Sequence, residues 1–204
     1  MLYGLPAGRI PGLEVSGTIR ELGENVTTVT VGQKVAAILP STGGFAEVVC
    51  APASLVAEVP DDLTMDLASV VPINTVTAHL ALTTAIRFVP GESLLIHAGA
   101  GGLGSQFAQV SRALGAGRID AVVGTDAKRE IALGFGYEHS YLRDDLSAIP
   151  GDTYDIVIDP VGGEATADAF RVLRSGGRLV RVGNASQAAD VAVNSTQHWL
   201  QNKT

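Results

Sequence analysis

The hydrophobic and polar positions have different periodicities before and after one glycine-rich stretch, residues 99–104. Residues 93–97, Ser-Leu-Leu-Ile-His, form a short apolar run without charge, which is typical of a strand buried on both faces of a parallel sheet. Beyond the glycines, apolar residues recur at helical spacing, at Phe107, Val110, Ala113 and Leu114. The pattern therefore predicts a buried strand that leads through a glycine turn into a helix over residues 105–114.

The alternation of strand and helix continues toward the C-terminus. Strands are predicted within residues 115–125, 154–159 and 177–183, and a helix over residues 164–174. Such alternation is typical of a doubly wound parallel sheet, which binds its ligands at the carboxyl ends of the strands. The loops at residues 160–163 and 183–186 are therefore expected on the ligand side of the sheet.

The N-terminal third has a different pattern. Short β-rich runs separated by Gly, Pro or Asn predict strands over Val15–Glu21, Lys34–Leu39, Phe45–Cys50 and Leu55–Val59. A helical connector is expected from Asp61 to about Thr84. The sequence thus predicts an α/β protein with a partial β-rich domain over residues 1–65 and a doubly wound domain over residues 66–204.

The glycine-rich stretch satisfies G-x-G-x-x-G directly between a predicted strand and a predicted helix, where this weak pattern becomes informative. Gly99 permits a tight turn, Gly101 leaves room for a pyrophosphate, and Gly104 lets the helix lie close to the strand. The N-terminus of the helix, with about half a positive charge, faces whatever lies over the glycines. The predicted dinucleotide-binding residues are Gly99, Ala100, Gly101, Gly102, Leu103 and Gly104. The alternative is a glycine-rich turn that binds nothing.

The end of the second predicted strand indicates which dinucleotide is bound. Proteins that bind NAD usually place a carboxylate there, about 20 residues past the glycines. This chain has Gly124 and Thr125 at that point, followed by Lys128, which we expect to contact the 2′-phosphate of NADPH. One such charge contact is worth about 1 to about 4 kcal/mol, so a preference of about tenfold or more is expected. Two alternatives stay open: Lys128 and Arg129 could be solvated charges, and Asp126 could bind the ribose of NADH.

Composition and charge exclude several classes of partner. The net charge of −7 disfavours nucleic acid and anionic membranes. No uninterrupted apolar run approaches the about 18 residues of a membrane span, so a cytoplasmic protein is expected. Cys50 is the sole cysteine, which excludes an intrachain disulfide, and we expect it to be a small buried hydrophobic residue.

Three N-terminal segments have a recognisable order and spacing: residues 10–23, 31–35 and 43–48. Together with the glycine turn, they resemble the medium-chain dehydrogenase/reductase superfamily, in its zinc-independent, zeta-crystallin-like quinone oxidoreductase branch. The resemblance implies a partial GroES-like substrate domain followed by a Rossmann domain. Members of the family carry roughly fifty residues before this region and on the order of a hundred after it. The chain is therefore expected to be a fragment, a truncated gene product or part of a longer protein.

The resemblance also implies catalytic residues. Tyr3 matches a tyrosine that lines the quinone pocket, and Thr77 lies in a segment that resembles the one carrying a threonine beside the nicotinamide. We therefore expect Tyr3 to be a hydrogen-bond donor on the substrate side and Thr77 to contact the cofactor. The alternative for Thr77 is a hydroxyl that bonds back to its own helix.

Further cofactor contacts follow from the strand ends and from the family pattern. Val161 lies in the loop after the fourth strand, and Gly183 and Asn184 resemble the family loop that meets the nicotinamide. In related sequences a second contact to the 2′-phosphate comes from a residue after the third strand. Here either Tyr141 or Arg143 can fill that place.

Zinc is not expected. The zinc-dependent alcohol dehydrogenases of the superfamily carry Gly-His-Glu where this chain has Gly12-Leu13-Glu14, and leucine cannot ligate a metal. Cys50 has no second cysteine to complete a site, and the four histidines, His79, His97, His139 and His198, lack ligand spacing.

The resemblance implies an NADPH-dependent oxidoreductase that transfers hydride to a quinone or another conjugated carbonyl acceptor, a small molecule. Without a metal, such a reaction relies on positioning and on hydrogen bonds to the oxygen that gains charge. One alternative is an enoyl-thioester reductase that acts on CoA or acyl-carrier-protein substrates. A second is a truncated dinucleotide-binding fragment without catalysis. The full-length protein is expected to be a homodimer.

Overall fold

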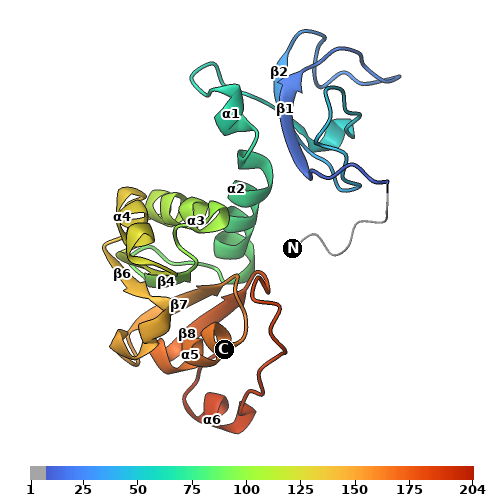
Figure 1. Ribbon diagram of the computed structural model, residues 1–204. Coiled ribbons are helices and arrows are strands. Elements are labelled where there is room, and N and C mark those ends of the chain that lie inside the picture. Colours follow the sequence, from blue (N-terminus) through green and yellow to red (C-terminus); the bar gives the residue numbers. More distant parts are fainter. Residues whose placement is uncertain (1–7) are drawn as a thin grey trace. The chain divides into compact units, whose positions relative to one another are not determined.

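The computed structural model describes residues 8–204 and shows two compact units (Figure 1). The units divide between residues 76 and 77, inside helix α2 (Val71–Leu80). A π-helical turn, η2 (Ala81–Ala85), follows this helix directly.

The division falls eleven residues later than the boundary expected after residue 65. Two hydrogen bonds show why the intervening residues stay with the N-terminal unit. The hydroxyl of Ser16 donates to the carbonyl of Met65 at 2.7 Å, and the amide of Ile73 donates to the carboxylate of Glu14 at 2.8 Å. Helix α1 (Met65–Ala68) and the start of α2 are thus tied to the β-rich residues.

The N-terminal unit contains a three-stranded antiparallel sheet in the order β1-β2-β3. Its strands are β1 (Glu14–Thr18), β2 (Lys34–Ile38) and β3 (Val56–Glu58), and a short 3-10 turn, η1 (Ala53–Leu55), precedes the last one. Three of the four strands predicted in this region are confirmed, with their ends shifted by at most three residues.

The fourth strand, predicted over Phe45–Cys50, is wrong. Only the amides of Gly44 and Phe45 pair with the backbone of a preceding loop, at 3.0 and 2.9 Å. Beyond them the segment bends, and the side chains of Phe45 and Val48 are 75% and 65% exposed. An apolar, β-prone run becomes a strand only where a partner continues the ladder and a face is buried. Cys50 is exposed as well, contrary to expectation.

The C-terminal unit is a five-stranded parallel sheet in the order β6-β5-β4-β7-β8. The strands are β4 (Ser93–His97), β5 (Arg118–Val123), β6 (His139–Leu142), β7 (Tyr154–Asp159) and β8 (Leu173–Arg181). The connecting helices are α3 (Gly102–Ala113), α4 (Asp126–Gly134) and α5 (Glu164–Val172), and a short turn, η3 (Arg143–Ala148), follows β6. This is the predicted doubly wound arrangement.

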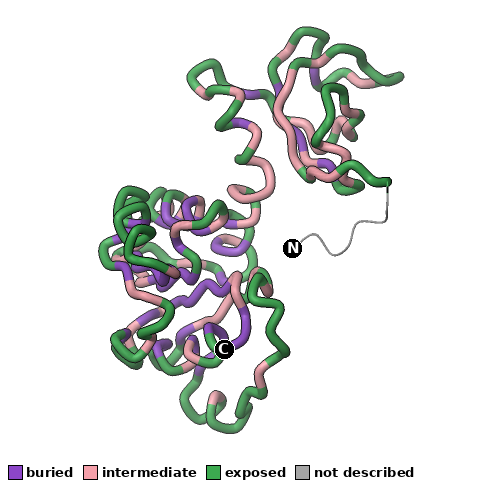
Figure 2. Tube along the Cα trace, in the orientation of Figure 1, coloured by how far each residue is buried: buried purple, intermediate pink, exposed green. Residues whose placement is uncertain are grey.

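Both faces of this sheet are buried, as the apolar run at residues 93–97 predicts (Figure 2). Leu94 and Ile96 face a core that α3 and α4 cover, whereas Leu95 belongs to a second core beneath α5. Phe107 of α3 is fully buried in the first core. Ala113, which the helical spacing placed on the same apolar face, is the last residue of α3 and is exposed instead, whereas Val110 and Leu114 are half-buried against the first core.

The chain continues after β8 through an extended segment to a short helix, α6 (Ser195–Leu200). The backbone of Asn202 and Thr204 then bonds to residues 176–179 along the edge of β8. Across residues 8–204, every helix is too short or too polar to cross a lipid bilayer.

Candidate active site

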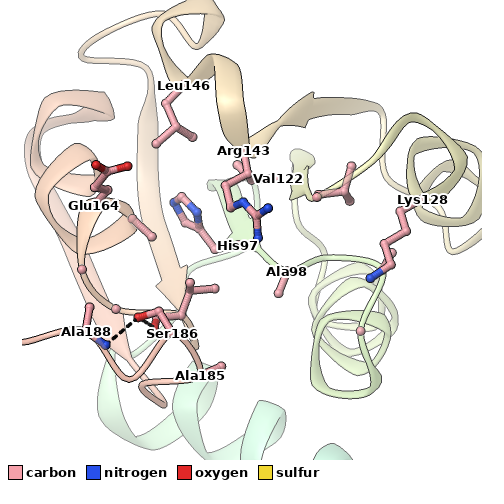
Figure 3. Close-up of a pocket in the computed structure, with 18 residues that line it drawn as sticks. His97, Ala98, Val122, Lys128, Arg143, Leu146, Glu164, Ala185, Ser186 and Ala188 are labelled. Carbon is pink, nitrogen blue, oxygen red and sulfur yellow. Dashed lines mark hydrogen bonds between the residues drawn. The ribbon is translucent and has the colours of Figure 1, made fainter.

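The carboxyl ends of the central strands border a cavity of about 650 Å³ (Figure 3). Its walls come from the glycine turn, the end of β5, the start of η3, the β7–α5 turn and the loop after β8. This is the edge at which doubly wound sheets bind ligands.

The glycine turn has no room for side chains at its critical positions. A Cβ on Gly104 would lie 2.5 Å from the carbonyl oxygen of Ala98 and 2.6 Å from that of Gly99. The turn closes with a hydrogen bond from the Gly101 amide to the Ala98 carbonyl at 2.9 Å. Ala100 and Gly101 line the cavity, so the N-terminus of α3 opens on it. Gly99, Gly102, Leu103 and Gly104 are not lining residues; they shape the turn and its helix.

Two cations reach the cavity beside the end of β5. Lys128 of α4 and Arg143 at the start of η3 both line it. A Cβ on Gly124 would lie only 3.8 Å from the guanidinium carbon of Arg143, so the guanidinium lies where a side chain at position 124 would project. Thr125 caps α4, because its hydroxyl oxygen accepts the amide of Lys128 at 3.4 Å. The end of β5 thus presents positive charge and no carboxylate.

The alternative nucleotide contacts lie elsewhere. Tyr141 of β6 is half-buried against the core beneath α5 and does not line the cavity. Arg129 donates to the carbonyl of Ser140 at 3.1 Å and pairs with Asp126 at 3.4 Å, and neither of these charged residues lines the cavity. Of the candidates left open by the sequence, the structure brings Lys128 and Arg143 together.

The turn between β7 and α5 is fixed from within by Asp159. This fully buried carboxylate accepts the amides of Val161 at 2.7 Å and Gly162 at 2.9 Å, together with the hydroxyl of Thr166. Gly162 and Gly163 have φ angles of 80° and 62°, which favour glycine. Val161, as predicted from its place after a strand, lines the cavity.

The loop after β8 is hydrogen-bonded to the turn between β7 and α5. The hydroxyl of Ser186 donates to the carbonyl of Val161 at 2.8 Å. A Cβ on Gly183 would approach the carbonyl oxygen of Pro160 to 2.8 Å, so a larger residue would separate the two segments. Asn184 donates to a carbonyl within its own loop at 3.1 Å. Gly183 and Asn184 therefore shape the loop, while Ser186 itself lines the cavity.

His97, the last residue of β4, is a lining residue that the sequence reasoning missed. Only 2% of it is exposed, and its Nε2 atom has no hydrogen-bond partner within residues 8–204. Burial lowers the pKa of His97, and the nearby charge of Asp159 opposes that shift in part. The imidazole is therefore neutral at neutral pH. The sequence does contain a signal that could have identified His97: it is a polar residue at the end of an otherwise apolar predicted strand.

The two residues predicted to be catalytic have different positions. Tyr3 lies outside the described residues. Thr77 is half-buried in α2 and is not a lining residue of the cavity. The roles of Tyr3 and Thr77 stay predictions.

The described residues show no cluster suited to a metal. Nowhere in residues 8–204 do three His, Cys, Asp or Glu side chains gather closely enough to hold an ion. Leu13, at the position of the expected histidine ligand, is 39% exposed. The expected zinc-free reaction stays a prediction.

Comparisons with known proteins agree with this fold. Residues 102–204 match the zinc-binding dehydrogenase family and residues 2–61 match the alcohol dehydrogenase GroES-like domain. A probable quinone oxidoreductase of Schizosaccharomyces pombe is 32% identical over 195 residues, covering 93% of this chain and 59% of that protein. Polyketide synthase GfsB of Streptomyces halstedii is 35% identical over 179 residues, covering 86% of this chain and 3% of that protein.

A comparison with a solved structure also agrees with this fold. Escherichia coli quinone oxidoreductase complexed with NADPH superposes with a TM-score of 0.86 at 25% identity, covering 100% of this chain and 65% of that one. The chain thus spans less than two thirds of these relatives. Its two family matches, its fold and its sequence similarity show that it belongs to the medium-chain dehydrogenase/reductase superfamily, in the quinone oxidoreductase-like branch.

Proposed function

We propose that this chain binds NADPH and serves a zinc-free transfer of hydride to a quinone or another conjugated carbonyl compound. The observation that carries the proposal is that two cations, Lys128 and Arg143, line the same cavity as Gly124 at the end of β5, with the guanidinium of Arg143 beside Gly124. A carboxylate at that point would repel a 2′-phosphate, whereas two cations attract it. The NADPH complex of the related Escherichia coli enzyme supports the choice of cofactor.

The residues present fit this cofactor. The N-terminus of α3 and the bare backbone of Gly101 can hold the pyrophosphate, since a cradle without side chains and a helix dipole suit that anion. Lys128 and Arg143 hold the 2′-phosphate by charge. Val161 and Ser186 form a wall that restricts how the bound molecule lies.

When bound, NADPH supplies a hydride from C4 of its nicotinamide. The protein contributes orientation, exclusion of water and hydrogen bonds to the acceptor oxygen. In this proposal Tyr3 donates to that oxygen and Thr77 contacts the nicotinamide side, as the family resemblance implies. A zinc ion takes no part, because Leu13 offers no ligand atom at the family's histidine position.

A second candidate is reduction of an enoyl thioester. The similarity to polyketide synthase GfsB over 86% of the chain favours it. The two reactions share the cofactor cavity and differ in the acceptor, so the acceptor decides between them.

The test measures NADPH oxidation by the full natural protein with a simple quinone, an enone and an enoyl-CoA thioester. We expect oxidation with the quinone or enone, and a strong reduction in the double variant Lys128→Ala, Arg143→Ala. Turnover with the thioester alone would favour the second candidate. No oxidation with any acceptor, despite NADPH binding, would contradict both and leave a dinucleotide-binding fragment.

A further inference from the structure

The turn between α4 and β6 contains a buried tyrosine, Tyr137, to which the sequence patterns gave no role. It follows Gly136, whose φ of 94° lets the chain reverse direction after α4. Tyr137 is only 3% exposed, and its side chain belongs to the core that α3 and α4 cover. It does not line the cavity. Any effect of Tyr137 on a ligand must therefore act through another part of the chain.

The Tyr137 side chain contacts both ends of the glycine motif. Its hydroxyl donates to the carbonyl of Gly104, the third glycine, at 2.7 Å. A Cβ on Gly99, the first glycine, would lie 3.2 Å from the ring carbon that bears this hydroxyl, so the ring fills the space beside Gly99. Neither Gly99 nor Gly104 lines the cavity, whereas Gly101 between them does. Tyr137 thus supports the turn from the core and leaves its cavity side free.

The hydrogen bond to Gly104 fixes a position; the carbonyl does not need it for a partner. A carbonyl inside an α-helix already accepts the amide four residues later, so the tyrosine hydroxyl is a second donor to the Gly104 oxygen of α3. Burial raises the pKa of Tyr137, so its hydroxyl keeps its proton and donates at neutral pH. Loss of this hydroxyl would leave the helix intact and would free its first turn to shift.

The residues on either side of Tyr137 bind the other end of α3. Arg112, in the last turn of this helix, donates to the carbonyl of Gly136 and pairs with the carboxylate of Glu138 at 3.5 Å. The amide of Glu138 donates to the carbonyl of Ile119 in β5 at 2.8 Å. Three successive residues of the α4–β6 turn thus contact α3 at both of its ends, and the sheet holds that turn in place.

We propose that Tyr137 is a positioning residue for the pyrophosphate of NADPH and acts through the first turn of α3. Its hydroxyl holds the Gly104 end of the glycine turn and its ring holds the Gly99 end, so the free amides at the start of α3 keep one direction toward the cavity. Amides held in place before binding lose less freedom when the ligand arrives. The inference rests on the proposed binding of NADPH and deepens it, because it assigns the affinity for one part of the cofactor to a residue outside the cavity.

The experiment compares NADPH with adenosine 2′-monophosphate, by isothermal titration calorimetry of the 204-residue chain. The second ligand keeps the phosphate that Lys128 and Arg143 attract and lacks the pyrophosphate. Tyr137→Phe removes only the hydroxyl. It should weaken NADPH binding by about fivefold, as expected for the loss of one hydrogen bond, and leave the affinity for adenosine 2′-monophosphate nearly unchanged.

Tyr154→Phe is the matched control. Tyr154 is also fully buried, its hydroxyl donates to Asp120, and it lies in the core on the other face of the sheet, away from the glycine turn. This variant should bind both ligands as the unsubstituted chain does. Thermal unfolding of both variants checks that each of them is folded.

An unchanged NADPH affinity in Tyr137→Phe would overturn the role of Tyr137 while NADPH binding stands. An equal loss for both ligands, or a similar loss of NADPH affinity in Tyr154→Phe, would assign the effect to general stability and would overturn it as well. If the unsubstituted chain does not bind NADPH, the proposed function fails, and this inference fails with it.

Discussion

Helices α3 and α5 begin at the same cavity, and their first turns differ in charge. The first turn of α3 has no acidic residue, and its cap is the bare backbone of Gly101. The first turn of α5 carries Glu164 after Gly163. Both helices offer the same free amides and the same positive dipole end. One carboxylate is therefore enough to separate a side of the cavity that suits phosphate from a side that suits a neutral, polar edge.

The largest effect should come from filling the glycine turn at α3. Gly104→Val should abolish nucleotide binding and lower the free energy of unfolding by more than about 4 kcal/mol, because its Cβ would collide with two backbone carbonyls. Titration with NADPH and thermal unfolding measure both effects. Gly134→Ala, at a position where a Cβ meets nothing within 4 Å, serves as the control. Native-like binding by Gly104→Val would show that the turn is looser than described.

On the α5 side of the cavity, the structure of the β7–α5 turn depends on the buried carboxylate of Asp159. Asp159→Ala should lower the free energy of unfolding by about 3 kcal/mol, since two amides and the Thr166 hydroxyl lose their acceptor. Asp159→Asn should lose less, because the amide oxygen can still accept from Val161 and Gly162. Chemical denaturation measures the difference. Equal stability of all three proteins would contradict the role given to Asp159.

A smaller effect is expected at the cap of α4, which positions Lys128. Thr125→Ala should cost about 1 kcal/mol of stability, since the side chain accepts the Lys128 amide. Thr125→Ser keeps the hydroxyl and should be nearly neutral. A loss of NADPH affinity in the serine variant as large as in the alanine variant would show that Thr125 acts in some way other than as a cap.

The smallest effect concerns pH. Because burial lowers the pKa of His97 in the folded chain, the unfolded chain binds a proton at this residue more readily, and stability falls as the pH drops below about 6.5. The melting temperature of the unsubstituted chain should therefore fall more between about pH 7 and about pH 5 than that of His97→Gln. His79→Gln, at an exposed histidine, should follow the unsubstituted chain. Parallel curves for all three proteins would contradict a buried neutral His97.

The strand, glycine turn and helix at residues 93–113 were predictable because their signals are local. An apolar run of five residues and three glycines at fixed spacing specify that unit without reference to distant residues. The segment at residues 45–50 has an equally β-prone composition, yet it is not a strand. Its structure depends on pairing partners, which its own sequence does not reveal.

The residues that line the cavity were predictable only in part, because residues that are distant in sequence form it together. Glu164 and His97 are distant in sequence, and the strand order that places β7 beside β4 brings them to one cavity. Tyr141 and Arg143 differ by two residues in register, and the end of β6 at Leu142 decides which of them reaches the cavity. Lys128 was predictable because it follows β5 at a short, fixed distance.

The most direct measurement is a fluorescence titration of the 204-residue chain with NADPH and with NADH, repeated for Lys128→Ala and for Arg143→Ala. NADPH should bind at least about tenfold more tightly than NADH, and each substitution should weaken NADPH binding by about tenfold while leaving NADH nearly unchanged. Arg20→Ala, a cation exposed in the N-terminal unit, should change neither affinity. Equal binding of the two nucleotides, or a preference for NADPH that survives each of the two substitutions, would contradict a 2′-phosphate site at the end of β5.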